Sequence, residues 1–246
     1  MRVKFLYLFL SVLTFVSCSK NYLKQKEDFT HYSLKQNQEG ENAKITIAEY
    51  KVKVDAETEK IIATSSDALT KDGEECTLGN FVCDALKYTS KKVFKDSLID
   101  IVLINRGGLR INLPKGNIKV MTIFELMPFE NELVMLKISG DKLLQGIPTI
   151  LEKNHPFLGL QLKAQNNELL ESTINKTSID ETKIYTIITS DYLANGGDNF
   201  VFLKEPLSIE KSNLKIRDAI INYCTYLTEN KKQITPYIDG RLQISK

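Results

Sequence analysis

The chain has 246 residues and a formal net charge of +2 at pH 7, with 33 basic and 31 acidic residues. This near balance argues against a polyanionic partner such as polymeric nucleic acid. With 42% hydrophobic residues, the chain can form one domain with a sizeable core, or two small ones.

Residues 1–17 have the features of a secretory signal peptide. A basic start at Arg2 precedes an apolar run from Phe5 to Val16. The run is shorter than the roughly 20 apolar residues of a membrane-spanning helix. Ser17-Cys18 then resembles the lipobox of bacterial lipoproteins, although Phe15 stands where leucine is usual.

This resemblance implies that Cys18 becomes the lipidated first residue of the mature chain. The protein would then be a membrane-anchored lipoprotein of the bacterial cell envelope, periplasmic or associated with the outer membrane. An ordinary cleaved signal peptide with an incidental cysteine is the alternative. Residues 18–43 are polar and without a hydrophobic period, which indicates a flexible tether, so we expect the folded domain to span residues 44–246.

The remaining cysteines are Cys76, Cys83 and Cys224. Three cysteines cannot all pair, so a full disulfide framework is excluded. We expect free and largely buried thiols.

The hydrophobic pattern of the folded region predicts intermixed helices and strands. Together they predict an α+β fold: a single domain with a mixed β-sheet and packed helices. In chain order we expect a strand or extended arm over Ile45–Val54, a helix carrying Ile61, Ile62 and Leu69, a helix over Leu78–Lys92, a buried strand over Asp100–Asn105, a turn at Pro114–Asn117, a short helix over Met121–Leu126, a strand over Leu133–Ile138, a helix from Gly140 to about Lys153, a meander over Leu158–Lys163 and Leu169–Ile174 with a turn at Asn166-Asn167, a buried strand over Tyr185–Thr189, a helix from about Asn213 to Thr228, and a last strand near Leu242.

Three segments that follow predicted strands or helices have the residue types of a binding site. In the first, Gly107 and Gly108 would let a ligand approach backbone amides, and Arg106 and Arg110 offer planar forks for phosphate oxygens. A strand-terminal turn with two solvated arginines is the alternative.

The second segment places Phe129 and Asn131 at a turn, where an aromatic face and an amide suit a purine. Phe129 could equally belong to the core.

In the third segment, Asp198 follows Gly196-Gly197 and could accept from both ribose hydroxyls, while Tyr192 gives a second aromatic face. A glycine helix cap with Asp198 starting the next turn is the alternative.

In combination, the segments resemble the 5'-nucleotidase C-terminal domain family from about Tyr50 to Leu203. The resemblance rests on the order helix-Gly-Asn, Asn-x-Gly-Gly-x-Arg, Pro-Phe-x-Asn and Tyr-Leu-Ala-Asn-Gly-Gly-Asp. It implies the fold of that domain and binding of a nucleotide or nucleoside. In the family, a separate metallophosphatase domain supplies two metal ions and the nucleophile.

The resemblance also implies roles for single residues. Phe129 and Tyr192 would stack on the two faces of the base, with Tyr192 standing where phenylalanine is usual. Asn131 would contact the base edge, Asp198 the ribose and Arg110 a phosphate, with Asn105 as a further polar contact. The family places another arginine before its Gly-Asn, but residues 73–78 hold none, and Arg106 could replace part of that charge or be solvated.

Two-metal hydrolysis needs a cluster of His, Asp and Asn ligands. This chain has only His31 and His155, and we expect both to be surface histidines. We therefore expect no catalytic residue, metal site or cofactor in this chain, and divalent metals in a partner catalytic domain. The leading hypothesis is the recognition half of a split 5'-nucleotidase with a separate metallophosphatase chain. A stand-alone nucleoside- or nucleotide-binding lipoprotein for scavenging or sensing is the alternative, and an independent hydrolase is the third.

Replacing Cys18 with alanine should release the protein from the envelope membrane, because that variant loses the acyl attachment. Membrane fractionation and immunoblotting of cells expressing either form measure the shift. A Cys18→Ala protein that still sediments with membranes would refute the lipobox assignment.

Overall fold

The computed structural model describes residues 41–95, 97–166 and 168–245. Residues from Ile47 onward form one compact unit. The predictions for the signal peptide, the lipidated Cys18, most of the tether and His31 lie outside the described residues. Within the described part, no helix is both long and apolar enough to cross a membrane.

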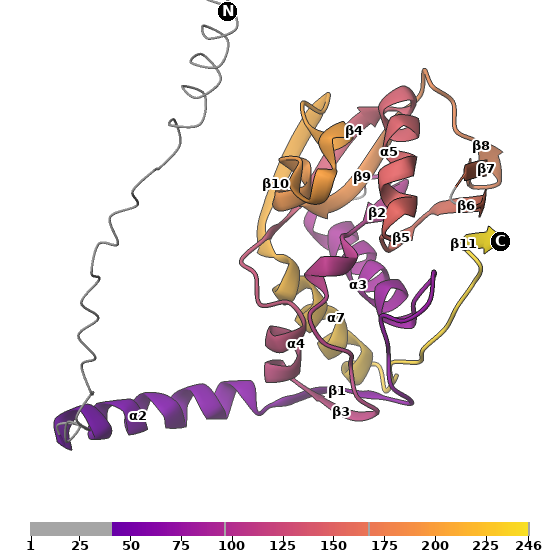
Figure 1. Cartoon of the computed structure of the whole chain (residues 1–246). Coiled ribbons are helices and arrows are strands. Elements are labelled where there is room, and N and C mark those ends of the chain that lie inside the picture. Colours follow the sequence, from indigo (N-terminus) through magenta and orange to yellow (C-terminus); the bar gives the residue numbers. More distant parts are fainter. Residues whose placement is uncertain (1–40, 96, 167, 246) are drawn as a thin grey trace, which may run out of the picture. The chain divides into compact units, whose positions relative to one another are not determined.

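A five-stranded sheet with the order β10-β4-β9-β2-β5 forms the centre of this unit (Figure 1). β2 and β9 pair in parallel, and the other neighbours pair antiparallel. The sheet is therefore mixed, as expected. Its strands are β2 (Ile101–Leu103), β4 (Glu132–Ser139), β5 (Phe157–Leu158), β9 (Ile184–Ser190) and β10 (Ser208–Lys215).

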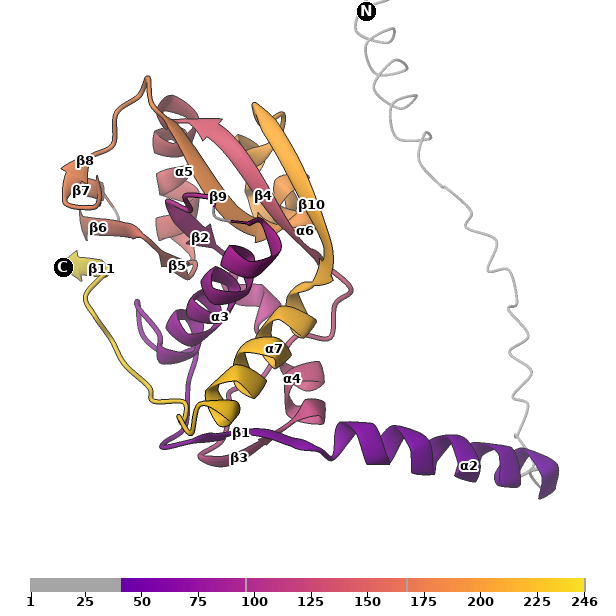
Figure 2. The same cartoon turned by 180° about the vertical axis from the view of Figure 1, so that it is seen from behind.

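Helices cover both faces of the sheet (Figures 1 and 2). Because successive side chains of a strand point to opposite faces, β4 contributes to two separate cores. Leu133 and Met135 pack in one core with α3 (Thr77–Val93) and α7 (Ile216–Glu229). Val134 and Leu136 pack in the other core with α5 (Gly140–Glu152). Burial on both faces explains why β2 is apolar at every position.

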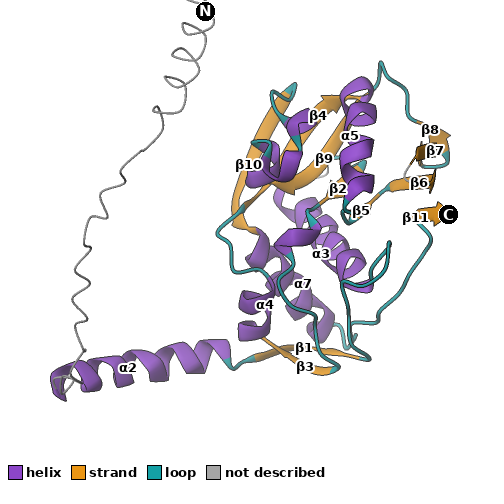
Figure 3. Ribbon diagram, in the orientation of Figure 1, coloured by secondary structure: helices purple, strands orange, loops and turns teal. Residues whose placement is uncertain are grey.

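Two smaller sheets flank this centre (Figure 3). One pairs β1 (Ile61–Ser65) with β3 (Gly116–Lys119), which leads into α4 (Val120–Leu126). The other has the order β11-β6-β7-β8, with β11 parallel to β6. Its members are β6 (Leu160–Gln165), β7 (Glu168–Ile174), β8 (Thr177–Ser178) and β11 (Leu242–Ser245).

Most predicted elements are confirmed, including the helices at α3, α4 and α5 and the buried strands β2 and β9. The three cysteines Cys76, Cys83 and Cys224 are free and buried, as predicted.

Some predictions about elements are wrong or incomplete. The turn expected at Pro114–Asn117 includes the first two residues of β3. The segment expected as an extended arm is helical, in α2 (Glu41–Thr58), and the segment expected as a helix forms β1. In a helix the backbone N–H and C=O groups pair within the segment itself. Residues around Val52 and Val54 therefore need no neighbouring strand as a hydrogen-bonding partner. The strand β10 is absent from the predictions, because this edge strand is largely exposed and lacks an apolar alternation.

Candidate functional site

The three segments predicted to form a binding site meet at one edge of the central sheet. β2 and β9 run parallel, so Asn105, which follows β2, and α6 (Asp191–Ala194), which follows β9, lie at the same edge. β4 runs antiparallel to β9, so its amino end, preceded by Asn131, also lies there. Ligands commonly bind at the carboxyl ends of such strands.

A pocket of about 320 Å³ lies at this edge. Every residue that lines it belongs to one of the three segments. The lining residues are Asn105, Gly107, Gly108, Arg110, Phe129, Asn131, Tyr192 and Asp198.

Two aromatic side chains of this pocket are accessible to solvent. Phe129 is 40% exposed and Tyr192 is 41% exposed, so Phe129 is not a core residue. The Arg110 guanidinium carbon lies 5.9 Å from the centroid of the Phe129 ring, which is within reach of a cation–π contact. The same guanidinium donates to the Gly107 carbonyl at 3.3 Å.

Asp198 accepts hydrogen bonds from two side chains of the pocket. Asn105 Nδ2 donates to Oδ2 at 2.6 Å, and the Tyr192 hydroxyl donates to Oδ1 at 2.9 Å. Partial burial raises the pKa of this carboxyl, but the bonds from Asn105 and Tyr192, with smaller contributions from His155 and Lys153, together lower it, and the net pKa lies below its usual range. The carboxylate is thus ionised at neutral pH and accepts hydrogen bonds only.

The glycines of the segments differ in what they do. Gly107 and Gly108 line the pocket, and a Cβ at Gly108 would lie 2.9 Å from Asn105 Oδ1. Gly196 and Gly197 instead line an adjoining hollow that shares Asn131 and Tyr192 with the pocket. A Cβ at Gly197 would lie 2.4 Å from the Tyr192 ring, so only glycine lets the ring occupy its place.

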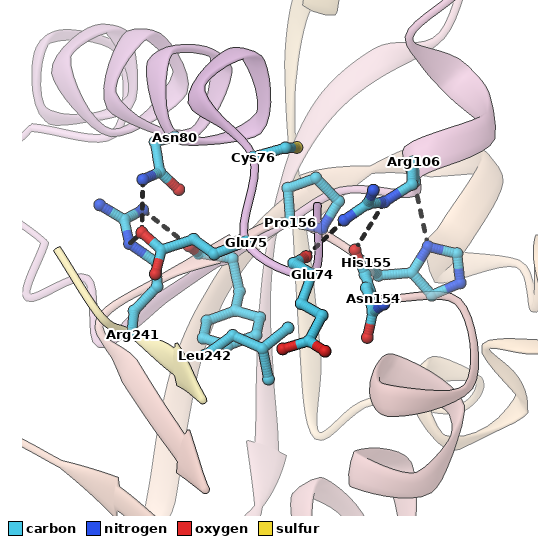
Figure 4. Close-up of a pocket in the computed structure, with 11 residues that line it drawn as sticks. Glu74, Glu75, Cys76, Asn80, Arg106, Asn154, His155, Pro156, Arg241 and Leu242 are labelled. Carbon is cyan, nitrogen blue, oxygen red and sulfur yellow. Dashed lines mark hydrogen bonds and ion pairs between the residues drawn. The ribbon is translucent and has the colours of Figure 1, made fainter. Parts of the chain in front are cut away.

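Arg106 points away from the pocket. Its guanidinium donates to the carbonyls of Lys71 at 2.6 Å and Gly73 at 2.8 Å. It also donates to the carbonyls of Asn154, at 2.9 Å, and of Glu74 (Figure 4). The space left among the residues around it is about 10 Å³, room for about one water molecule. Arg106 therefore joins the end of β2 to the loop before α3, and the structure does not bring it to the predicted ligand site.

His155 is 1% exposed, so the expectation of a surface histidine is wrong. Its Nδ1 accepts from the Arg106 backbone N–H at 3.1 Å (Figure 4), and its ring packs against Phe200. Burial lowers the pKa of His155 to about 4, so the imidazole is neutral at physiological pH. Its place in a loop before Pro156 gives no sequence signal of this burial.

Within residues 41–95, 97–166 and 168–245, no group of three or more His, Cys, Asp and Glu side chains could hold a metal ion.

The pocket has the chemistry to recognise a flat polar ligand. Two aromatic faces can stack on a ring, the Asn131 amide can bond to polar ring atoms, and the Asp198 carboxylate can accept from hydroxyl groups. The exposed Arg110 adds a positive charge for an anionic group.

Comparison with known proteins gives a consistent family match. The family model described as "5'-nucleotidase, C-terminal domain" matches residues 51–205. The chain is 28% identical over 214 residues to an apyrase of Tabanus yao, covering 75% of this chain and 38% of that protein. It is 24% identical over 199 residues to the human 5'-nucleotidase, covering 70% of this chain and 34% of that protein.

Solved structures share the fold. A 5'-nucleotidase precursor from Thermus thermophilus superposes with a TM-score of 0.71 at 22% identity, covering 83% of this chain and 43% of that one. The NAD nucleotidase of Haemophilus influenzae gives a TM-score of 0.64 at 16% identity, covering 83% and 41%. The chain thus spans less than half the length of each of these relatives.

The two arginines of the first segment should differ in their effect on stability. Arg106→Ala should lower the free energy of unfolding by about 1–3 kcal/mol, because carbonyls lose a charged donor. Arg110→Ala should change it by no more than about 0.5 kcal/mol, because Arg110 is exposed. Denaturant titration of both variants measures this, and equal losses would contradict the contacts assigned to Arg106.

Proposed function

We propose, since the chain belongs to the 5'-nucleotidase C-terminal domain family, that its pocket binds a nucleoside or nucleotide. The observation that carries the proposal is the meeting of three distant segments in one pocket with two exposed aromatic faces and a carboxylate. Each of these groups suits one part of a nucleoside.

In this proposal, the base stacks on Phe129 and Tyr192, and Asn131 bonds to its polar edge. Asp198 accepts from the ribose hydroxyls, and Asn105 is a further polar contact. Arg110 faces the phosphate of a nucleotide, because it is the positively charged side chain among the residues that line the pocket. Arg106 is left out, because backbone carbonyls already occupy its guanidinium.

We further propose that this domain is the recognition half of a 5'-nucleotidase-type hydrolase whose catalytic half is a separate metallophosphatase chain. Two-metal hydrolysis would supply the chemistry there, with divalent ions held by that partner. The chain has only two histidines, and one of them, His155, is buried with Nδ1 bonded to backbone. We also propose that Cys18 anchors the protein in the cell envelope, where it would meet extracytoplasmic nucleotides.

Phe129→Ala should weaken adenosine binding by about tenfold to a hundredfold, since stacking of a base on an aromatic side chain is worth roughly 1–3 kcal/mol. Isothermal titration calorimetry with the purified chain measures the change. Phe124→Ala is a matched control, because Phe124 is 37% exposed but lies outside the pocket. Equal adenosine affinities for the wild type and both variants would refute the proposed site.

The split arrangement makes a separate kinetic prediction. Adding this chain to a secreted metallophosphatase encoded in the same genome should lower the KM of the latter for AMP by at least about tenfold, because the base and ribose gain a binding surface. Phe129→Ala should remove most of that effect, and Phe124→Ala should retain it. If the KM of the metallophosphatase for AMP is the same with and without this chain, and the chain still binds adenosine, a stand-alone binding protein is supported instead.

A further inference from the structure

The Tyr192 hydroxyl makes two hydrogen bonds to one residue. It donates to Asp198 Oδ1 at 2.9 Å and accepts from the Asp198 backbone N–H at 3.2 Å. The backbone of Asp198 has a φ of +49°, in the left-handed region that non-glycine residues rarely adopt. One hydroxyl therefore fixes both the side chain and the backbone of Asp198.

The opposite oxygen of the same carboxylate is also fixed. Asn105 Nδ2 donates to Oδ2 at 2.6 Å, and Asn105 itself is only 8% exposed. Each carboxylate oxygen thus has one protein donor and retains capacity to accept another. The orientation of the carboxylate is set before any ligand arrives.

The Tyr192 ring is fixed as well. It packs over Gly197, where a Cβ would lie 2.4 Å from the ring atoms. The ring lines the pocket and its hydroxyl contacts Asp198, so a single side chain connects the surface proposed for the base to the group proposed for the sugar. A phenylalanine at this position would keep the ring and lose that connection.

We propose that Tyr192 is a specificity-determining positioning residue whose hydroxyl holds the Asp198 carboxylate in place to accept from both hydroxyls of a vicinal diol. The inference rests on the proposed nucleoside site and adds its ligand class: ribonucleosides in preference to 2'-deoxyribonucleosides. Two adjacent hydroxyl groups match two carboxylate oxygens that each retain a free lone pair. A 2'-deoxyribose offers one such donor and leaves the second oxygen without a ligand partner.

The charge state of Asp198 supports this selectivity. Burial raises the pKa of its carboxyl, but the hydrogen bonds from Asn105 and Tyr192, together with the nearby His155 and Lys153, give a net lowering of the pKa. An ionised carboxylate cannot donate, so it binds hydroxyl donors and disfavours acceptors such as a phosphate oxygen. Removing the Tyr192 hydroxyl should therefore change both the geometry and the pKa of Asp198.

The test compares the wild type with Tyr192→Phe, and uses Tyr226→Phe as a matched loss of a hydroxyl outside the pocket. Calorimetric titrations use adenosine, 2'-deoxyadenosine and adenine as ligands. The wild type and Tyr226→Phe should bind adenosine about tenfold or more tightly than 2'-deoxyadenosine. Tyr192→Phe should bring that ratio down to about threefold or less and leave the affinity for adenine within about twofold.

A second measurement needs no ligand. In ¹³C NMR titrations of the carboxyl groups, the pKa of Asp198 should be higher in Tyr192→Phe than in the wild type, because a bond to the ionised form is lost. Melting curves establish that both variants are folded.

The outcomes separate this inference from the proposed function. Adenosine binding with an unchanged preference in folded Tyr192→Phe, or an unchanged pKa of Asp198, would overturn the role of Tyr192 and leave the nucleoside site intact. The nucleoside site would be overturned if the wild type binds neither adenosine nor adenine, even though the pKa of Asp198 differs between the wild type and Tyr192→Phe. A wild type that binds adenosine and 2'-deoxyadenosine equally would overturn the selectivity alone.

Discussion

The parallel pairing of β2 with β9 is the constraint on which the site depends. Ile101 and Val102 align with Ile187 and Ile188, and both strands are buried between two helical layers. A parallel pair requires a long crossover, which here contains β4 and α5. The pairing brings Asn105 and Asp198, 93 residues apart in sequence, to a hydrogen-bonding distance of 2.6 Å.

This arrangement explains which parts of the fold the sequence could reveal. β2 is recognisable because burial on both faces requires apolar residues at every position, and α3 and α5 because each presents an apolar stripe to the sheet. The strand β10 lies at an edge and is largely exposed, so its residues carry no such pattern. In α2, the alternation of Val52 and Val54 favoured a strand. Both side chains are exposed, so this alternation does not mark a face that packs against a core.

In the candidate site, too, some features could be predicted from the sequence and others could not. Residue types next to strand ends indicated most of the residues that line the pocket, but each segment alone also had a structural alternative. The resemblance to the family combined the three segments and added Asn105. Arg106 and Arg110 could not be told apart, since they flank the same Gly107-Gly108 pair. The short turn η1 (Arg106–Gly108) sends one guanidinium to the carbonyls before α3 and leaves the other at the pocket.

Side-chain chemistry that depends on tertiary geometry was beyond sequence reasoning. Tyr192 was predicted through its ring alone, whereas its hydroxyl reaches Asp198 only because Gly197 lets the ring lie across the turn. The burial of His155, which lowers its pKa to about 4, likewise depends on tertiary packing. A neutral imidazole near an ionised Asp198 places no full positive charge beside the carboxylate, which leaves hydrogen-bond donors as its nearest partners. The selectivity we infer follows from the fixed carboxylate, because each of its oxygens already accepts one protein hydrogen bond and can accept a second one from a ligand hydroxyl.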